Sequence, residues 1–155
     1  GNFVAVILIS IVMMIALKSM RFGLLSLIPN IAPLIMTFGI WALLVGKVGM
    51  AAATVSATSL GIIVDNTVHI LTKYQRAREE LALSIEDAIR YTFDTVGAAV
   101  VANALILALG FSVLMFSAFK VTEEMGILTA LAITIALIVD LLMLPAILML
   151  RAKTK

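Results

Sequence analysis

Five long apolar stretches dominate this sequence and constrain its fold more than any other feature. They cover residues 3–17, 24–46, 48–72, 95–117 and 125–150. A helix needs about 20 apolar residues to cross about 30 Å of hydrocarbon. We therefore predict an all-α, multi-pass membrane helix bundle with five transmembrane helices.

The composition supports this fold class and excludes others. Of the 155 residues, 63% are hydrophobic and 13% are charged, whereas soluble domains have about 45–50% and about 25%. A soluble globular enzyme is therefore excluded. The absence of cysteine excludes disulfides and thiol chemistry. The sequence also has no nucleotide-binding, metalloprotease or serine-hydrolase motif, so we expect no enzyme activity, no metal site and no bound cofactor.

The basic residues predict the orientation of the chain. Nine of the 11 Lys and Arg residues follow the first, third and fifth apolar stretches, and only Lys47 and Lys120 lie on the opposite side. Cytoplasmic segments of membrane proteins carry an excess of Lys and Arg. We therefore predict an extracytoplasmic N-terminus and a cytoplasmic C-terminus. The net charge of +2 then reflects membrane topology, and we expect no nucleic-acid partner.

The sizeable loop at residues 73–94 falls on the predicted cytoplasmic side. Ser84 and the acidic residue three positions later resemble a capping box. An apolar stripe at helical spacing follows, formed by Ile85, Ala88 and Ile89. We predict a short amphipathic helix on the cytoplasmic face of the membrane; a plain solvated connector is the alternative.

Three polar side chains lie at nearly the same depth in three of the stretches. Counted from the cytoplasmic ends at 1.5 Å per residue, Asp65 lies about 12 Å deep, Asn103 about 13 Å and Asp140 about 16 Å. Polar groups at this depth usually face a protein interior or a water path, so we predict that all three face inward in one helix cluster. The alternative is that they only hold helices together by hydrogen bonds. His69 either handles protons or is a satisfied interfacial histidine.

Small residues spaced by four precede each of these polar groups, and small residues let membrane helices approach closely. The stripes are Ala53, Ala57, Gly61, Asp65 and His69; Thr95, Ala99 and Asn103; and Ala132, Ala136 and Asp140. We predict that each stripe packs tightly against a neighbouring helix. Pro145 cannot donate to the carbonyl of Leu141, so we expect a loosened helix just beyond Asp140.

Three segments carry a resemblance to a known family. Gly61–Glu80, GIIVDNTVHILTKYQRAREE, resembles the GxxxD signature of the resistance-nodulation-division superfamily, in particular its MMPL and Patched-like branch. Leu109–Phe116 resembles the penultimate helix of that branch. Gly126–Leu150 resembles its last helix, with an acidic residue followed by Leu-Leu-x-Leu-Pro-Ala. The resemblance implies that residues 1–155 form one transmembrane domain, the last five of twelve helices.

The resemblance also implies a function. It indicates the transmembrane part of an exporter, driven by the proton motive force, of lipids or other hydrophobic compounds in a bacterial inner membrane. Protons would be the coupling ion, and Asp65 would be the proton-relay position. Its neighbour is Asn66 here, where many members carry an acidic residue or Tyr. The candidate proton-relay residues are Asp65, Asp140, Asn103, His69 and Asn66, and the candidate packing residues are Gly61, Ala57, Ala136 and Pro145.

The expected partners are a lipid or hydrophobic small molecule, the N-terminal half and extracytoplasmic domains of the same protein, and a second copy in a homo-oligomer. Two other functions remain open. One is a sterol-sensing-like module that binds lipid without pumping. The other is an accessory subunit of the Sec translocon, a related fold with a similar Asp in the equivalent helix. The LLMLPAILML ending favours export.

Overall fold

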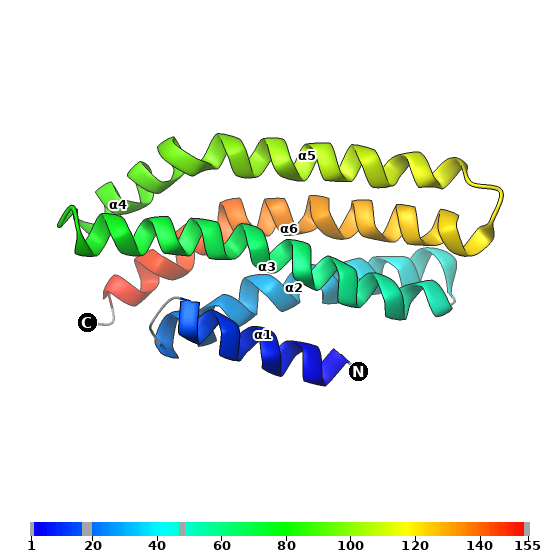
Figure 1. Cartoon of the computed structure of the whole chain (residues 1–155), viewed down its shortest axis with the longest axis horizontal. Helices are drawn as coiled ribbons and strands as arrows, with labels where there is room; N and C mark the ends of the chain where they lie inside the picture. The colour runs from blue at the N-terminus through cyan, green and yellow to red at the C-terminus, as the bar shows by residue number, and fades with distance from the viewer. Residues whose placement is uncertain (1, 17–19, 47–48, 154–155) are drawn as a thin grey trace.

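The computed structural model describes residues 2–16, 20–46 and 49–153, and over these ranges the chain is helical with no β-strand. The helices, with two short irregular turns, are α1 (Asn2–Ala16), α2 (Met20–Val45), α3 (Met50–Glu79), α4 (Ile85–Thr92), the π-helical turn η1 (Phe93–Gly97), α5 (Ala98–Val113), the 3-10 turn η2 (Leu114–Phe116) and α6 (Lys120–Lys153). Figure 1 shows the long helices side by side along one axis. The predicted all-α membrane helix bundle is confirmed.

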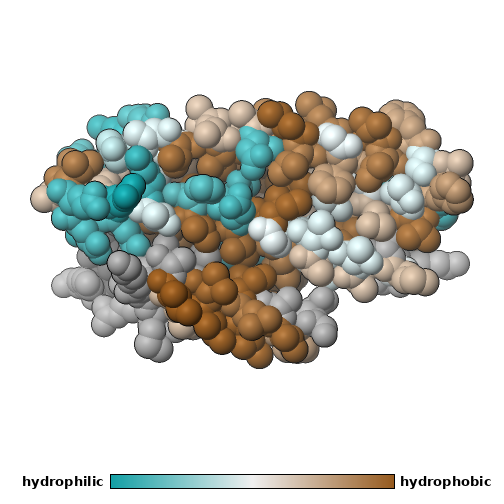
Figure 2. Space-filling view, viewed as in Figure 1, coloured by the Kyte–Doolittle hydropathy of each residue, from teal (hydrophilic) through white to brown (hydrophobic). Residues whose placement is uncertain are grey.

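The helices alternate in direction as the basic residues predicted. The end of α1, the turn between α3 and α4 and the C-terminal end of α6 lie at one end of the bundle (Figure 1). The end of α2 and the turn between α5 and α6 lie at the other end. Hydrophilic residues gather at the first end (Figure 2). Three of the basic residues used in that prediction, Lys18, Lys47 and Lys155, lie outside the described residues.

Three described helical stretches are long and apolar enough to cross a membrane by length and composition. They are Leu27–Val45, Ile85–Phe116 and Lys120–Met149. α1 has 15 residues and extends about 22 Å, and the small and polar residues of α3 lower its apolarity. The predicted spans 3–17 and 48–72, whose residues 17 and 48 are outside the described ranges, therefore stay predictions.

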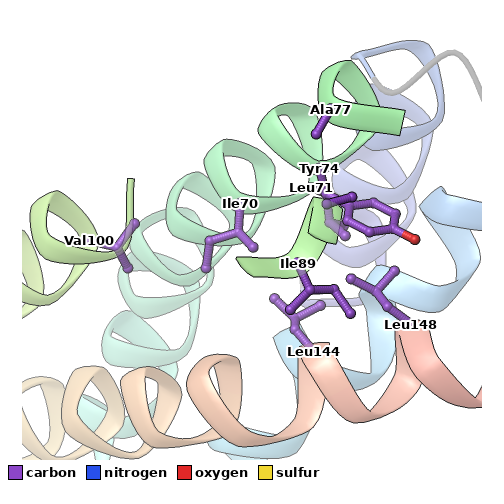
Figure 3. Close-up of a cluster of buried hydrophobic side chains, with 9 residues drawn as sticks. Ile70, Leu71, Tyr74, Ala77, Ile89, Val100, Leu144 and Leu148 are labelled. Atoms are coloured by element: carbon purple, nitrogen blue, oxygen red, sulfur yellow. The ribbon is translucent and has the colours of Figure 1, made fainter. Parts of the chain in front are cut away.

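α6 forms the centre of the bundle, because α2, α3 and α5 all pack against it. A cluster of buried apolar side chains joins α3, α4, α5 and α6 near the α3–α4 turn (Figure 3). Its members are Ile70, Leu71, Tyr74, Ala77, Ala88, Ile89, Val100, Leu144 and Leu148. Two smaller clusters continue the core along α3 and α6 toward the opposite end, and both include residues of α2.

The predicted amphipathic helix exists, and its apolar side packs against the bundle. α4 begins where expected, since Ser84 Oγ accepts a hydrogen bond from the backbone N–H of Asp87 at 3.3 Å. Its apolar side is buried against the bundle, with Ala88 0% and Ile89 8% exposed; its location on the cytoplasmic face of the membrane stays a prediction. Residues of α3 and α6 pack against this apolar side of α4.

α4 also continues into α5 through η1 instead of ending before the fourth apolar stretch. The threonines around this turn bond to helix carbonyls: Thr92 Oγ1 donates to Ala88 O at 2.7 Å, and Thr95 Oγ1 donates to Tyr91 O at 2.8 Å. Side-chain hydroxyls that donate hydrogen bonds to helix carbonyls often bend helices and accompany irregular turns. The helical run from Ile85 to Phe116 is therefore continuous but changes direction at η1 (Figure 1).

Candidate functional site

α3 carries polar side chains on two opposite sides, and this arrangement defines two separate sites. Asp65 and His69 lie one turn apart on the outer side, where their side chains are 64% and 65% exposed. Thr67, between them in sequence, lies on the inner side and is 0% exposed. A step of two residues turns a helix by about 200°, so residues 65 and 67 cannot share one face.

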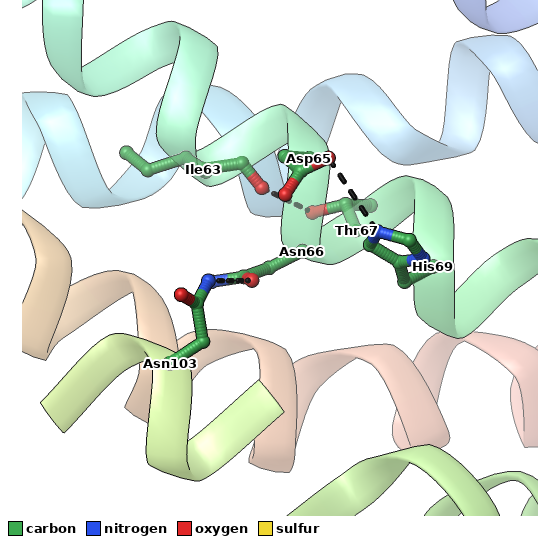
Figure 4. A network of polar contacts seen from close by, with 6 residues as sticks. All are labelled: Ile63, Asp65, Asn66, Thr67, His69 and Asn103. Atoms are coloured by element: carbon green, nitrogen blue, oxygen red, sulfur yellow. Dashed lines mark hydrogen bonds and ion pairs between the residues drawn. The ribbon is translucent and has the colours of Figure 1, made fainter. Parts of the chain in front are cut away.

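The outer site is a partly open cavity of about 330 Å³ between α3 and the η1–α5 segment, which we call the outer pocket. Its lining residues are Asp65, Asn66, His69, Val96, Ala99, Val100 and Asn103. Asp65 Oδ1 lies 3.5 Å from His69 Nε2, and Figure 4 shows this carboxylate–imidazole pair on the outer side of α3. In the space-filling view, a hydrophilic patch extends from the polar end of the bundle into the apolar middle (Figure 2).

Asn66 and Asn103 close one side of the outer pocket. Asn103 Nδ2 donates to Asn66 Oδ1 at 3.4 Å and so joins α5 to α3 (Figure 4). Asn66 is 4% exposed, whereas Asn103 is an exposed residue. The pair joins the two helices at the level of Asp65.

The inner site, which we call the inner cluster, consists of Asn30 from α2, Thr67 from α3 and Asp140 from α6. All three are buried, with 1%, 0% and 0% exposed. Thr67 Oγ1 lies 2.7 Å from Asn30 Oδ1 and 3.3 Å from Asp140 Oδ1. The inner cluster therefore links the three helices that form the centre of the bundle.

Of the three polar residues predicted to face inward, only Asp140 is buried within this chain; whether Asp65 and Asn103 face the interior of a longer protein stays a prediction. Asp65 and Asn103 lie at the outer pocket. Apolar residues explain the difference, because α3 turns branched side chains such as Val55 and Ile63 toward α2 and α6. The stripe spaced by four then falls on the outer side.

The small-residue stripes divide in the same way. Ala132 and Ala136 on α6 are buried as predicted, with 0% and 2% exposed. Ala57 and Gly61 on α3 are exposed, and a Cβ at Gly61 would meet no atom within 4 Å. That stripe is not packed within this chain. Pro145 does not interrupt the helix, since α6 continues to Lys153.

Two members of the inner cluster, Asn30 and Thr67, were not among the predicted site residues. The depth argument could have found Asn30, which lies nine residues after Arg21 and so about 14 Å along its helix. Thr67 has no such signal, because threonine in a membrane helix commonly bonds to its own backbone.

The chemistry of both sites is that of oxygen and imidazole groups. In the described part of the chain, no group of three or more His, Cys, Asp or Glu side chains gathers to hold a metal ion. The outer pocket offers a carboxylate and an imidazole that can each take up or release a proton, next to two amides. The inner cluster offers an amide, a hydroxyl and a carboxylate away from the surface.

Comparison with known proteins identifies the family. A sequence model of the MMPL family matches residues 1–155. A protein of Methanocaldococcus jannaschii whose name describes it as a membrane protein, MJ1562, is 27% identical over 150 residues. The match covers 97% of this chain and 38% of that relative, so the chain spans less than half of the relative's length. Because the family match covers the whole sequence, this chain belongs to the MMPL family and forms a membrane domain of the resistance-nodulation-division type.

Proposed function

We propose that this chain is the transmembrane part of a transporter that exports lipids or other hydrophobic compounds and is driven by protons entering through the outer pocket. The family supports a transporter-like membrane domain. On this proposal the chain is not an enzyme, and protons are its coupling ion. The substrate would be handled together with the rest of a longer protein, including its extracytoplasmic domains.

The observation that carries the proposal is an ionisable pair within an apolar surface. Asp65 and His69 are both exposed on α3, at a depth where ionisable side chains are costly unless they face water or protein. The cavity of about 330 Å³ beside them is large enough to admit water. A carboxylate with water access on one side can load a proton there and release it when access changes.

The exposed stripe of α3 supports the second part of the proposal. Ala57 and Gly61 leave the surface next to Asp65 open, and small residues permit a close helix contact. The N-terminal half of the same protein would cover this stripe and enclose the outer pocket. The protons would then pass between the two halves and not through lipid.

The orientation and the membrane are also part of the proposal. The basic end of the bundle would face the cytoplasm by the positive-inside rule, with the N-terminus outside. A bacterial inner membrane, across which a proton motive force exists, would supply about 2.3 kcal/mol per proton and 100 mV.

The test is export by the full-length protein carrying Asp65→Asn. Cells or vesicles would be loaded with a fluorescent hydrophobic dye, and efflux would be followed after an inward proton gradient is imposed. We expect the initial rate to fall at least tenfold, because Asn keeps the size and hydrogen bonding but cannot carry a proton. Asp87→Asn, the same change at an exposed carboxylate of α4, should leave efflux unchanged at equal protein level.

Two results would contradict the proposal. Efflux by Asp65→Asn at the wild-type rate would remove the proton-carrying role. Gradient-independent binding of a sterol or lipid by the wild type, with no efflux of any hydrophobic probe, would favour the sterol-sensing alternative. A secretion defect on deletion, without any effect on efflux, would favour the Sec accessory function.

A further inference from the structure

We propose that His69 carries protons from Asp65 toward the polar end of the bundle, so that the two side chains act one after the other. This inference rests on the proposed function, because it assigns the route by which a proton bound at Asp65 leaves the outer pocket. It is carried by the geometry of the carboxylate–imidazole pair, by the position of His69 along α3 and by the residues that line the pocket.

The imidazole of His69 is placed to take a proton from Asp65. Its Nε2 atom lies 3.5 Å from Asp65 Oδ1, a separation that a small side-chain rotation or one bridging water closes for proton transfer. The two residues are one turn apart on the same side of α3 (Figure 4). Histidine is the side chain that takes up and releases protons near neutral pH.

The two nitrogens of the imidazole ring allow a proton to pass through it. The carboxylic acid of Asp65 gives its proton to Nε2 of a neutral ring whose hydrogen is on Nδ1. The imidazolium then loses the Nδ1 proton to water and leaves a neutral ring beside an ionised carboxylate. Exchange of the ring proton with water restores the first tautomer, so one proton crosses the pair in each cycle. The side chain of His69 is 65% exposed, which leaves the ring accessible to that water.

His69 lies between Asp65 and the polar end of the bundle. Four residues of α-helix advance about 6 Å, so a proton that reaches His69 has moved by that distance toward the turn between α3 and α4. Hydrophilic residues gather at that end and extend from it into the apolar middle (Figure 2). In the proposed orientation this end is cytoplasmic, and a proton driven inward would meet Asp65 before His69.

The opposite wall of the outer pocket offers the proton no competing site. From η1 and α5, the lining residues are Val96, Ala99, Val100 and Asn103. None of these side chains titrates near neutral pH. Of the lining residues that the structure describes, Asp65 and His69 are the titratable ones. A proton that leaves Asp65 for another side chain of the pocket therefore has His69 as its acceptor.

Lys73, the next residue at this spacing on α3, does not take the place of His69. It is eight residues from Asp65 and so about 12 Å along the helix. Its ammonium lies 5.6 Å from the centroid of the Tyr91 ring, which is a cation–π contact with α4. The described ion pair of Asp65 is with His69, so the imidazole is the basic group that faces this carboxylate.

The test is dye efflux by the full-length protein in proteoliposomes under an inward proton gradient, with proton entry followed by a trapped pH-sensitive dye in parallel samples. His69→Gln keeps hydrogen-bonding groups but cannot carry a proton near neutral pH. We expect both initial rates to fall at least about tenfold. Arg76→Gln is the matched control, since Arg76 is an exposed basic residue of α3 that pairs with Glu80. Its two rates should equal those of the wild type.

A second variant distinguishes proton transfer from a structural role. His69→Ala leaves room beside Asp65 and should lose efflux to a similar extent, and free imidazole on both sides of the membrane should raise its rate at least about threefold. Each rate is divided by that of the wild type in the same imidazole buffer, so that any loss of the gradient to this permeant base affects both proteins. Imidazole should not restore Asp65→Asn, which delivers no proton.

Three results would overturn the inference. Efflux by His69→Gln at the wild-type rate, with Asp65→Asn inactive, would mean that Asp65 exchanges protons directly with water, and it would leave the proposed function intact. Loss of efflux in both His69 variants without any effect of imidazole would assign His69 a structural role. Normal efflux and proton entry in Asp65→Asn would contradict the proposed function and remove the proton donor from this route.

Discussion

At Gly126, α6 lies against the end of α5 and η2 with no room for a Cβ, and replacement by alanine gives a sharp test of the packing. A Cβ at this position would lie 2.6 Å from Leu114 Cβ, 2.6 Å from the carbonyl oxygen of Phe111 and 3.2 Å from the carbonyl carbon of Leu114. Two of these atoms belong to the backbone, so no side-chain rotation relieves the overlap. Gly126→Ala must therefore push α6 away from α5 and η2.

Two effects of opposite sign determine the magnitude. Alanine favours a helix over glycine by about 1 kcal/mol, whereas overpacking costs about 1–3 kcal/mol. Because the overlap is with backbone, the larger value applies, and the free energy of unfolding should fall by about 2 kcal/mol. For a chain of this length, that change lowers the midpoint of thermal unfolding by about 4–8 °C.

The assay is thermal unfolding of the purified protein in detergent, followed by circular dichroism. Gly110→Ala on α5 is the control, because a Cβ there would meet no atom within 4 Å. It should raise the stability by about 0.5–1 kcal/mol through helix propensity alone. The two substitutions should thus differ in sign, and a Gly126→Ala protein as stable as the control would refute the close approach of α6 and α5.

Three further predictions concern topology, backbone strain and helix contact. Single cysteines introduced at Glu86 and at Ala118, in a chain without natural cysteine, should be labelled from opposite sides of the membrane by an impermeant reagent; labelling from one side would contradict the alternation of helices. Ala82 has φ of 50°, a region that costs a non-glycine residue about 1 kcal/mol, so Ala82→Gly should unfold at the same or a higher temperature, and a clear decrease would argue against this turn. Asn103→Leu removes the hydrogen bond to Asn66, and such bonds contribute about 0.6 kcal/mol to stability in membranes, so the free energy of unfolding should fall by about that amount. A decrease above about 2 kcal/mol in the same unfolding assay would show that this pair does more than join two helices.

The lengths of the apolar stretches and the positions of the charges predicted where the helices lie better than which side of each helix is buried. α2, α5 and α6 follow from continuous apolar stretches, and the Ser84 cap follows from local hydrogen bonding. The sequence could not predict which side of α3 packs against α2 and α6. Lipid is as apolar as a protein core, so apolar side chains are compatible with either surrounding. The irregular turn at Phe93–Gly97 contains a glycine only at its end and no proline, so no breaker residue marks its beginning.

The sequence predicted how far along its helix each polar residue lies, but not which of these residues come together. Asp65, Asn103 and Asp140 lie in α3, α5 and α6, and α3 and α5 both pack against α6. Depth is set by sequence position alone, whereas grouping depends on how each helix is rotated about its axis. That rotation is fixed by packing among branched side chains such as Val55 and Leu128, whose partners lie far apart in the sequence.

Because α6 is long, the tilt of this protein in the membrane should depend on the thickness of the bilayer. Its candidate span Lys120–Met149 has 30 residues and extends about 45 Å, against about 30 Å of hydrocarbon, and Lys120, Glu123 and Glu124 lie in its first turns. Burying only the part after Glu124, which extends about 38 Å, still needs a tilt of about 37°, near the upper end of the range of about 0–40° seen for membrane helices. Because α2, α3 and α5 pack against α6, they must lean with it. Lipids with longer acyl chains should therefore set the whole bundle more upright and shift the depth at which Asp65 meets water.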